Sequence, residues 1–181
     1  MSFPHVVSGN PDLEVKMILK GKAHCLGDDI NTDYIISGRY KFKTLDKKEM
    51  ASHLMEDLDP EFVKKIEPGD IIVAGSNFGC GSSREQAPLV IRYAGISVVA
   101  AKSFARIFFR NSINVGLPLI EFDTSGIKSG DQLEVDFSAG KLINATQGEA
   151  ITFKPLPKIM LDIINEGGLV PYFQKYGSFR L

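Results

Sequence analysis

Residues 71–100 have the sequence IIVAGSNFGCGSSREQAPLVIRYAGISVVA, and this stretch decides the expected fold. Four consecutive apolar residues at 71–74 predict a buried strand, and a glycine-rich segment follows them. A helical pattern then runs over about 84–93 and ends before Gly95. A second apolar strand is predicted at 96–100. The order strand, helix, strand is typical of an α/β domain.

Periodic segments extend this unit toward the C-terminus. The pattern predicts a second helix from residue 104 and a further strand at 117–122. The sequence then alternates between apolar and polar residues at 130–137 and around 151–153, and glycines bound both segments, so we expect antiparallel strands there. A terminal amphipathic helix is predicted at 157–166.

On the N-terminal side, residues 1–14 contain Pro and Gly without a period, and we expect a loose leader. Short apolar and basic residues alternate at 15–25 and predict one or two strands. The capping-box sequence DKKE at 46–49 predicts the start of a helix whose apolar positions continue to Leu58. The whole chain, 1–181, is therefore expected to form one α/β domain with a central strand–helix–strand unit and additional antiparallel strands.

The composition excludes several classes of function. The 21 Lys and Arg residues balance the 22 Asp and Glu residues to a net charge of −1, which disfavours nucleic-acid or membrane-surface binding. No apolar run approaches the roughly 18–20 residues that span a bilayer. The N-terminus lacks the basic and apolar regions of a secretory signal, so we expect a cytoplasmic protein.

Cysteine and histidine are too sparse to predict a metal site within this chain. Cys25 and Cys80 are far apart, and no C-x-x-C pair is present. An iron–sulfur cluster or a structural zinc needs three or four such ligands. The three histidines show no ligand spacing either. We therefore expect no metal or cofactor bound by this chain alone.

The densest functional signal is the segment 75–86, between the first buried strand and the helix. Its glycines allow main-chain amides to approach a ligand, and the helix N-terminus that follows favours an anion. Ser82, Ser83 and Arg84 stand at this point, and an arginine can hold a carboxylate with two parallel hydrogen bonds. The pattern indicates a carboxylate-binding loop.

One other interpretation of the same segment stays open, and two nucleotide-binding interpretations are disfavoured. Ser82 with Glu85, or Ser83 with Gln86, also fits a capping box, in which case the serines only start the helix. A phosphate-binding P-loop would require Lys followed by Ser or Thr, which is missing. The dinucleotide fingerprint G-x-G-x-x-G is matched only by the pair of glycines in 79–81.

Residues 77–88, with the sequence NFGCGSSREQAP, resemble the signature of the swivel domain of the aconitase superfamily. Two further segments agree, GDDINTD at 27–33 and AKSFARIFFRN at 101–111. The similarity runs from about residue 17 to the C-terminal helix. It is greatest to the separate small subunits of 3-isopropylmalate dehydratase and of archaeal-type homoaconitase. The resemblance implies an aconitase-type swivelling β/β/α domain.

The resemblance also implies a reaction and a partner. In that family a separate large subunit holds a [4Fe-4S] cluster through its own cysteines, and one iron binds the hydroxyl and a carboxylate of the substrate. The enzyme removes water from a 2-hydroxy dicarboxylic acid and adds it back with the hydroxyl on the neighbouring carbon. The small subunit supplies the base, which by resemblance is Ser82 acting as an alkoxide. Arg84 would stabilise that charge and clamp a carboxylate, and Ser83 and Asn77 belong to the same substrate-binding loop.

Three more residues match the family around this loop. Thr32 and Asp33 correspond to its Thr-Asp pair, and we expect Asp33 to orient either Arg84 or a residue of the large subunit. An exposed turn aspartate without such a role is the alternative. Arg106, in the third segment, either reaches the substrate or braces the fold.

The choice of substrate depends by resemblance on the segment after the Thr-Asp pair, where Lys41, Phe42 and Lys43 follow a tyrosine. Isopropylmalate enzymes tend to have apolar residues there, and enzymes for tricarboxylates have an arginine; this chain departs from both. Lysine can pair with a carboxylate, whereas Phe42 can pack on an alkyl group. We favour isopropylmalate and hence leucine biosynthesis, with homoaconitate or dimethylmalate as alternatives. A stand-alone anion-binding module is the non-enzymatic alternative.

Overall fold

The computed structural model describes residues 17–40 and 46–180. The predicted leader at 1–14 and the candidate substrate residues Lys41, Phe42 and Lys43 lie outside these ranges. The described chain builds a mixed seven-stranded sheet with the strand order β4-β3-β2-β1-β5-β6-β7. The α/β fold class with additional antiparallel strands is therefore confirmed.

Four strands form the parallel half of the sheet. The two central ones, β2 and β3, are buried on both faces, as expected for parallel strands that are covered on both sides. The four are β1 (Ile18–Cys25), β2 (Ile71–Ala74), β3 (Val98–Ala101) and β4 (Leu119–Glu121). With the helices α3 (Gln86–Tyr93) and α4 (Arg106–Asn114), the unit β2-α3-β3-α4-β4 matches the strand–helix–strand–helix–strand order that the apolar runs predict.

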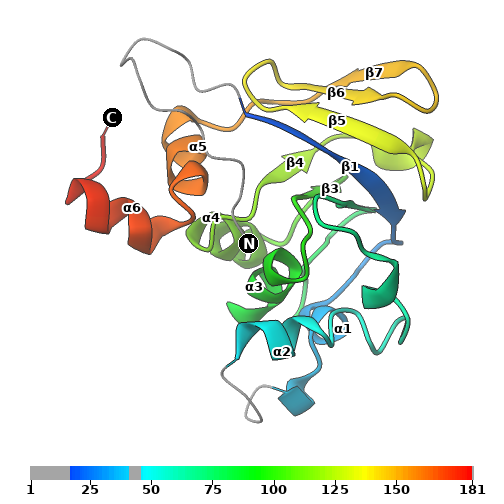
Figure 1. Ribbon diagram of the computed structural model, residues 1–181, viewed down its shortest axis with the longest axis horizontal. Helices are drawn as coiled ribbons and strands as arrows, with labels where there is room; N and C mark the ends of the chain where they lie inside the picture. The colour runs from blue at the N-terminus through cyan, green and yellow to red at the C-terminus, as the bar shows by residue number, and fades with distance from the viewer. Residues whose placement is uncertain (1–16, 41–45, 181) are drawn as a thin grey trace.

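The antiparallel half begins at β1, which pairs with β2 on one side and with β5 on the other. Buried and exposed residues alternate along β6, in agreement with a strand that is covered on one face. The antiparallel strands are β5 (Gln132–Asp136), β6 (Lys141–Asn144) and β7 (Glu149–Thr152). Figure 1 shows this meander on the side of the molecule opposite α1 (Thr32–Ile35), α2 (Lys47–Ala51) and α3.

Six α-helices and three short 3-10 helices complete the described fold. The α-helices are α1 (Thr32–Ile35), α2 (Lys47–Ala51), α3 (Gln86–Tyr93), α4 (Arg106–Asn114), α5 (Lys158–Asn165) and α6 (Leu169–Tyr176). The 3-10 helices are η1 (Gly38–Tyr40), η2 (Val63–Lys65) and η3 (Thr124–Gly126).

Two apolar layers pack on opposite faces of the parallel strands. Ile72 and Val99 point toward the helices and pack in one cluster with residues of α1 to α4, among them Val90. Ile71 and Val98 point the other way and pack against the meander. Successive residues of a strand face opposite sides, so each parallel strand contributes to both layers. The result is a β/β/α arrangement, which is the predicted one.

The C-terminal helices form a third cluster against α4. Tyr172 of α6 is fully buried there and packs with Ile163 and Ile164 of α5. Helix α6 is absent from the sequence-based prediction. Its apolar residues recur at helical spacing after Gly168, and Gly177 ends it with a left-handed φ of 71°, so the pattern was present in the sequence.

Two predicted helix boundaries are wrong. Asp46 caps α2 as expected, because its side chain accepts hydrogen bonds from the N–H groups of Lys48 and Glu49 in the first turn. However, α2 ends at Ala51 and does not reach Leu58. The chain turns because Met55 adopts a positive φ of 57° and its N–H donates to the carbonyl oxygen of Ile35 in α1. A tertiary hydrogen bond thus replaces the next helical one. Helix α3 begins at Gln86, two residues later than predicted.

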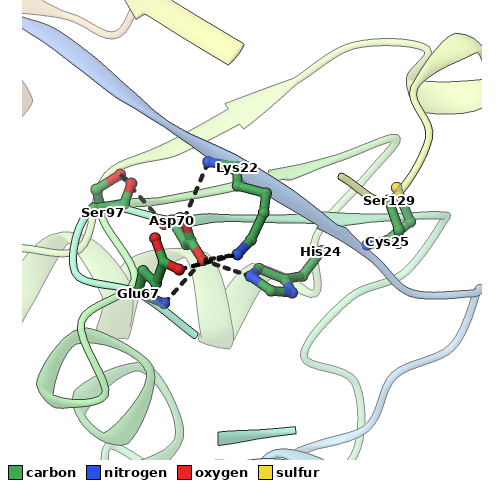
Figure 2. Close-up of polar contacts among 8 residues, drawn as sticks. Lys22, His24, Cys25, Glu67, Asp70, Ser97 and Ser129 are labelled. Atoms are coloured by element: carbon green, nitrogen blue, oxygen red, sulfur yellow. Dashed lines mark hydrogen bonds and ion pairs between the residues drawn. The ribbon is translucent and has the colours of Figure 1, made fainter. Parts of the chain in front are cut away.

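A polar cluster braces the N-terminal end of β2 (Figure 2). Asp70 precedes this strand and is buried, and it accepts hydrogen bonds from the main-chain N–H groups of Lys22 and Glu67 at 3.1 and 2.9 Å. His24 Nε2 lies 2.6 Å from Asp70 Oδ2. Burial alone would raise the pKa of Asp70, but the hydrogen bonds from Glu67, His24 and Lys22 outweigh it and lower that pKa. These contacts tie β1 to β2 at the end of the sheet away from the glycine-rich loop.

Candidate active site

The glycine-rich loop leaves the C-terminal end of β2, the edge at which parallel sheets commonly bind ligands. At its first residue, Gly75, a Cβ atom would stand 1.9 Å from Asp28 Oδ1. Asp28 Oδ1 accepts a hydrogen bond of 2.6 Å from the N–H of Ser76, and the Ser76 carbonyl accepts one of 2.9 Å from Asp29. The first predicted motif, at 27–33, therefore lies directly against the start of the loop.

Main-chain hydrogen bonds join the three motif segments into one site. Gly79 donates to the carbonyl oxygen of Ile30 at 2.7 Å, and Cys80 accepts from the N–H of Thr32 at 2.9 Å. On the other side, the N–H of Phe78 donates to Ser103 at 3.0 Å. Segments that are about 25 and 50 residues from the loop in sequence thus hold it from both sides.

Gly79 must be glycine for two reasons. Its φ is +79°, a conformation that residues with a Cβ rarely adopt. An added Cβ would also lie 2.1 Å from Cγ of Phe108 in α4. The Phe108 ring packs edge-on against Phe78, with the two ring centroids 5.2 Å apart. This contact seats the loop on α4.

The loop, α1 and the first turns of α4 line an open pocket of about 320 Å³. Five of the residues that the sequence singled out line it together. The lining residues are Thr32, Gly79, Gly81, Ser82, Ser83, Arg84, Ala105, Arg106, Ile107, Phe108 and Asn111. The pocket therefore contains the serine pair and the guanidinium that the sequence proposed for carboxylate chemistry.

Arg84 is fixed from the side of α1. Its Nη2 atom lies 2.5 Å from Asp33 Oδ1, and its Nη1 atom donates to the carbonyl oxygen of Ile36 at 3.1 Å. Only 15% of the Arg84 side chain is exposed, whereas 57% of the Asp33 side chain is. Asp33 thus contacts Arg84, one of the two partners considered for it. A guanidinium has five N–H groups, so others stay free for a ligand.

Ser82 and Ser83 do not cap α3, so the capping-box interpretation is wrong. The N-cap position belongs to Glu85, and no side chain caps this helix. Both serines are exposed, and neither hydroxyl has a hydrogen-bond partner within the described part of the chain. The carbonyl oxygen of Ser82 accepts a 2.8 Å hydrogen bond from Thr32 Oγ1, which fixes the main chain beneath the serine. The hydroxyls are left available to a ligand.

Asn77 lies outside the pocket. It has a positive φ of 59°, its N–H donates to Ser103 Oγ at 2.8 Å, and its side-chain amide donates to Asp29 Oδ1 at 2.8 Å. These bonds brace Asn77 within the loop, and the expected substrate contact stays a prediction. Arg106, in contrast, is exposed at the pocket and makes no ion pair with any described residue.

The sequence analysis did not single out Ile107 and Asn111, which also line the pocket. Both belong to the third motif segment, and they stand four residues apart, on one face of α4. Helical spacing from Arg106 leads to residues 109, 110 and 113, so it would not have identified them. Ile107 is 44% exposed, so it adds an apolar wall at the mouth of the pocket.

The described residues do not fit an iron–sulfur cluster or a metal ion. Across 17–40 and 46–180, no three His, Cys, Asp or Glu side chains are grouped closely enough to hold a metal. Cys80 lies in the loop, but burial, and next the negative charge of Asp29, raise the pKa of its thiol. A thiol that stays protonated is a poor metal ligand.

Comparison with known proteins identifies the fold and its relatives. Residues 22–125 match the family model for the aconitase C-terminal domain. The chain is 55% identical over 165 residues to 3-isopropylmalate dehydratase small subunit 2 of Archaeoglobus fulgidus, covering 91% of this chain and 100% of that protein. This chain belongs to the 3-isopropylmalate dehydratase small-subunit family. The family assignment accounts for the order of the three motifs around the pocket.

Other members of the small-subunit family agree. The small subunit from Caldicellulosiruptor bescii is 53% identical over 158 residues, which cover 86% of this chain and 95% of that one. The crystal structure of 3-isopropylmalate dehydratase from Methanocaldococcus jannaschii superposes with a TM-score of 0.86 at 49% identity, covering 89% of this chain and 96% of that chain. The swivel-domain fold inferred from the motifs is therefore confirmed. No helix in the described ranges is long and apolar enough to cross a membrane.

Proposed function

We propose that this chain is the small subunit of a 3-isopropylmalate dehydratase, a hydro-lyase that interconverts 2-isopropylmalate and 3-isopropylmalate in leucine biosynthesis. Its relatives at 50–55% identity carry this name over nearly their full length. The single observation that carries the proposal is the exposed Ser82 beside the anchored Arg84 in one pocket. A cytoplasmic location stays a prediction.

In this proposal Ser82 is the base. Dehydration removes a proton from the carbon next to a carboxylate while hydroxide leaves the neighbouring carbon, and a carbon–carbon double bond forms. The proton passes to Ser82 Oγ, and rehydration returns it to the other carbon. The Ser82 hydroxyl has no hydrogen-bond partner in the described chain, so no intramolecular contact must break before it reacts. A base must lie within hydrogen-bond reach of the proton that it takes.

Arg84 supplies the positive charge that an alkoxide and a substrate carboxylate both require. An ordinary serine hydroxyl is far too weakly acidic to ionise in water, so its charged form needs preorganised stabilisation. Arg84 provides it because Asp33 and the carbonyl oxygen of Ile36 already hold the guanidinium in place. No reorganisation is then required during the reaction. The same guanidinium can form paired hydrogen bonds to a carboxylate.

The proposal assigns the [4Fe-4S] cluster to a separate large subunit. When bound, such a cluster supplies a Lewis-acidic iron for the departing hydroxyl. The two cysteines of the present chain lie in different places, Cys25 on β1 and Cys80 in the loop, and both have a raised pKa, chiefly because of burial. The small subunit contributes the base, the carboxylate clamp and part of the pocket wall. It is active only as a heteromer.

The pocket wall favours isopropylmalate over a tricarboxylic acid. Ala105, Ile107 and Phe108 give the α4 side of the pocket an apolar surface, which suits an isopropyl group. Homoaconitate and dimethylmalate remain the alternatives, because Lys41 and Lys43 could pair with a further carboxylate. Replacing Lys43 by Val is expected to raise the KM for a tricarboxylate far more than the KM for isopropylmalate. Equal effects on the two KM values would show that Lys43 does not determine which substrate the enzyme prefers.

Anaerobic co-expression with a cluster-bearing large subunit tests the proposal. The complex is assayed on isopropylmalate, homocitrate and dimethylmalate, and we expect isopropylmalate to have the highest kcat/KM. Ser82→Ala should reduce kcat by at least about 10³-fold, within the range for loss of an acid–base group. The control is Ser125→Ala, a change of the same kind on η3, outside the pocket-lining set. A Ser82→Ala complex with near-normal kcat would remove Ser82 from its role.

The same preparation separates the enzyme from a stand-alone anion-binding module. A module would bind dicarboxylates without a partner, whereas a dehydratase small subunit would copurify with a larger cluster-bearing chain. Binding of a dicarboxylate to the isolated chain, with no large subunit captured and no dehydration activity after mixing, would favour the module.

A further inference from the structure

One buried polar side chain in the pocket lacks the partner that such groups normally have. Asn111 of α4 is 6% exposed and lines the pocket. No side-chain or main-chain group of the described chain hydrogen-bonds its amide. The described chain also contains no side-chain nitrogen or oxygen atom that is both sealed from solvent and unpaired. The Asn111 amide is therefore open to the pocket that it lines.

The other buried polar residues show that this is unusual for the molecule. Asn144 of β6 is 1% exposed, and its amide donates to Asp131 at 2.7 Å while its oxygen accepts from Gln147 at 3.2 Å. A buried asparagine with a structural role thus uses both ends of its amide. Hydrogen bonds within the chain also satisfy the remaining members of this group, Thr32, Asp70, Ser112, Thr124 and Asp131. Asn111 alone among the buried polar residues of the described ranges is without one.

The surroundings of the Asn111 amide favour an anion. The pocket borders the start of α4, where Ala105 is the N-cap and no side chain caps the helix, so first-turn N–H groups lack intrahelical partners. The guanidinium of Arg106 is exposed at the same pocket without an ion pair, and Arg84 lines it as well. An amide in positive surroundings acts best through its N–H donors, and a carboxylate oxygen is the matching acceptor.

We infer that Asn111 is a substrate-binding residue whose side-chain N–H donates a hydrogen bond to a carboxylate oxygen of the hydroxy acid in this pocket. A buried amide without a partner is costly, and the substrate supplies that partner on binding. This inference rests on the proposed dehydratase function and extends it by one residue. It also explains why α4 contributes to the site beyond its first turn.

The test measures KM and kcat of the complex with the cluster-bearing large subunit for Asn111→Ala and Asn111→Leu. We expect KM to rise about tenfold, equivalent to about 1.4 kcal/mol of lost binding, for both variants. The kcat value should change little for Asn111→Ala, because a contact made equally in the ground state and the transition state affects KM alone. Asn114→Ala is the matched control, since Asn114 belongs to α4 but lies outside the pocket-lining set.

Thermal unfolding of the isolated small subunit separates binding from folding. Because the amide makes no bond within the described chain, Asn111→Leu should unfold no earlier than the wild type. A lowered unfolding temperature together with an unchanged KM would make Asn111 structural and overturn the inference. An unchanged KM with normal stability would mean that the Asn111 amide hydrogen-bonds only to water, and this result would also overturn the inference. Inactivity of the wild-type complex on all three acids would instead refute the proposed function, and the inference with it.

Discussion

Asp33→Asn should separate the orientation of Arg84 from its charge. The substitution keeps the shape of residue 33 but removes the carboxylate that lies 2.5 Å from Arg84 Nη2. Arg84 then keeps only its bond to the carbonyl oxygen of Ile36 as a fixed anchor. Without the Asp33 carboxylate, the Arg84 side chain must be ordered during catalysis, which costs about 0.5–1.5 kcal/mol. We therefore expect kcat to fall about two- to twelvefold.

Two consequences of Asp33→Asn distinguish this explanation from a general loss of structure. Asp33 competes with the substrate for the guanidinium, so its neutralisation should leave KM unchanged or lower. The free energy of unfolding should fall by less than about 1 kcal/mol, because 57% of the Asp33 side chain is exposed and such ion pairs are weak. Steady-state kinetics of the complex and urea denaturation of the small subunit measure the two quantities.

The control is Glu61→Gln, which breaks an exposed ion pair with Lys64 of similar kind, 2.7 Å long. Glu61 is outside the pocket-lining set, so we expect wild-type kcat and a comparably small loss of stability. If kcat of Asp33→Asn stays at the wild-type value, Arg84 does not depend on Asp33 for its position. If KM rises instead and kcat is unchanged, the carboxylate acts in binding and the orientation argument is wrong.

Three further predictions concern the stability of the fold. Gly79→Ala should lower the free energy of unfolding by well over 2 kcal/mol, since backbone strain and a clash with the ring of Phe108 add together. Gly130→Ala is the control, because Gly130 also has a positive φ but an added Cβ there would lie within 4 Å of no other atom. Denaturant titration should show a clearly smaller loss of unfolding free energy for this variant. Asp70→Asn should cost about 1–3 kcal/mol at pH 7. The pKa of Asp70 is lower in the folded protein than the value of about 3.9 in an unfolded chain, so the ionised carboxylate stabilises the fold above about pH 4. In urea titrations, the stability difference between the wild type and Asp70→Asn should therefore shrink as the pH falls below about 4. Arg92→Met should cost about 1–3 kcal/mol, measured by thermal unfolding, because Arg92 Nη1 donates to two main-chain carbonyl oxygens at 2.6 and 2.9 Å; an unchanged midpoint would contradict it.

Local signals in the sequence were sufficient for the centre of the fold. The apolar run at 71–74 is the buried strand β2, and the strand predicted at 96–100 overlaps the buried strand β3 at 98–100; strands covered on both faces have such apolar sequences. The position of β1 between β2 and β5 was not predictable in this way. It depends on pairing between residues that are about 50 and 110 positions apart, and nothing in the local pattern of β1 specifies either neighbour. The early end of α2 has the same cause, a hydrogen bond from Met55 to a distant helix.

The candidate site likewise has residues that the sequence predicted and residues that depend on tertiary contacts. The motif at 77–88 predicted which side chains would gather, and the pocket contains Ser82, Ser83 and Arg84. Asn77 is not among the pocket-lining residues, and its side-chain amide donates to Asp29, which no spacing rule reveals. Asn111 was missed because a helical asparagine looks alike in sequence whether it faces water or a pocket. Its significance emerges only from the absence of a partner in the described fold.

The openness of this site is itself an argument for a second subunit. An alkoxide at Ser82 is stabilised by Arg84 only where water is excluded, because the attraction between two unit charges about 4 Å apart is near 1 kcal/mol in water and several times larger in a protein environment. In the described chain both serines are exposed, Arg106 has no ion pair, and Ile107 is 44% exposed at the pocket. The proposed base and part of the apolar wall are thus open to solvent in the part of the chain that the structure describes. A surface that closes over α1, the loop and the start of α4 would bury Ile107 and strengthen the pull of Arg84 on the serine. The small subunit alone is therefore expected to bind a dicarboxylate weakly and to leave Ser82 protonated.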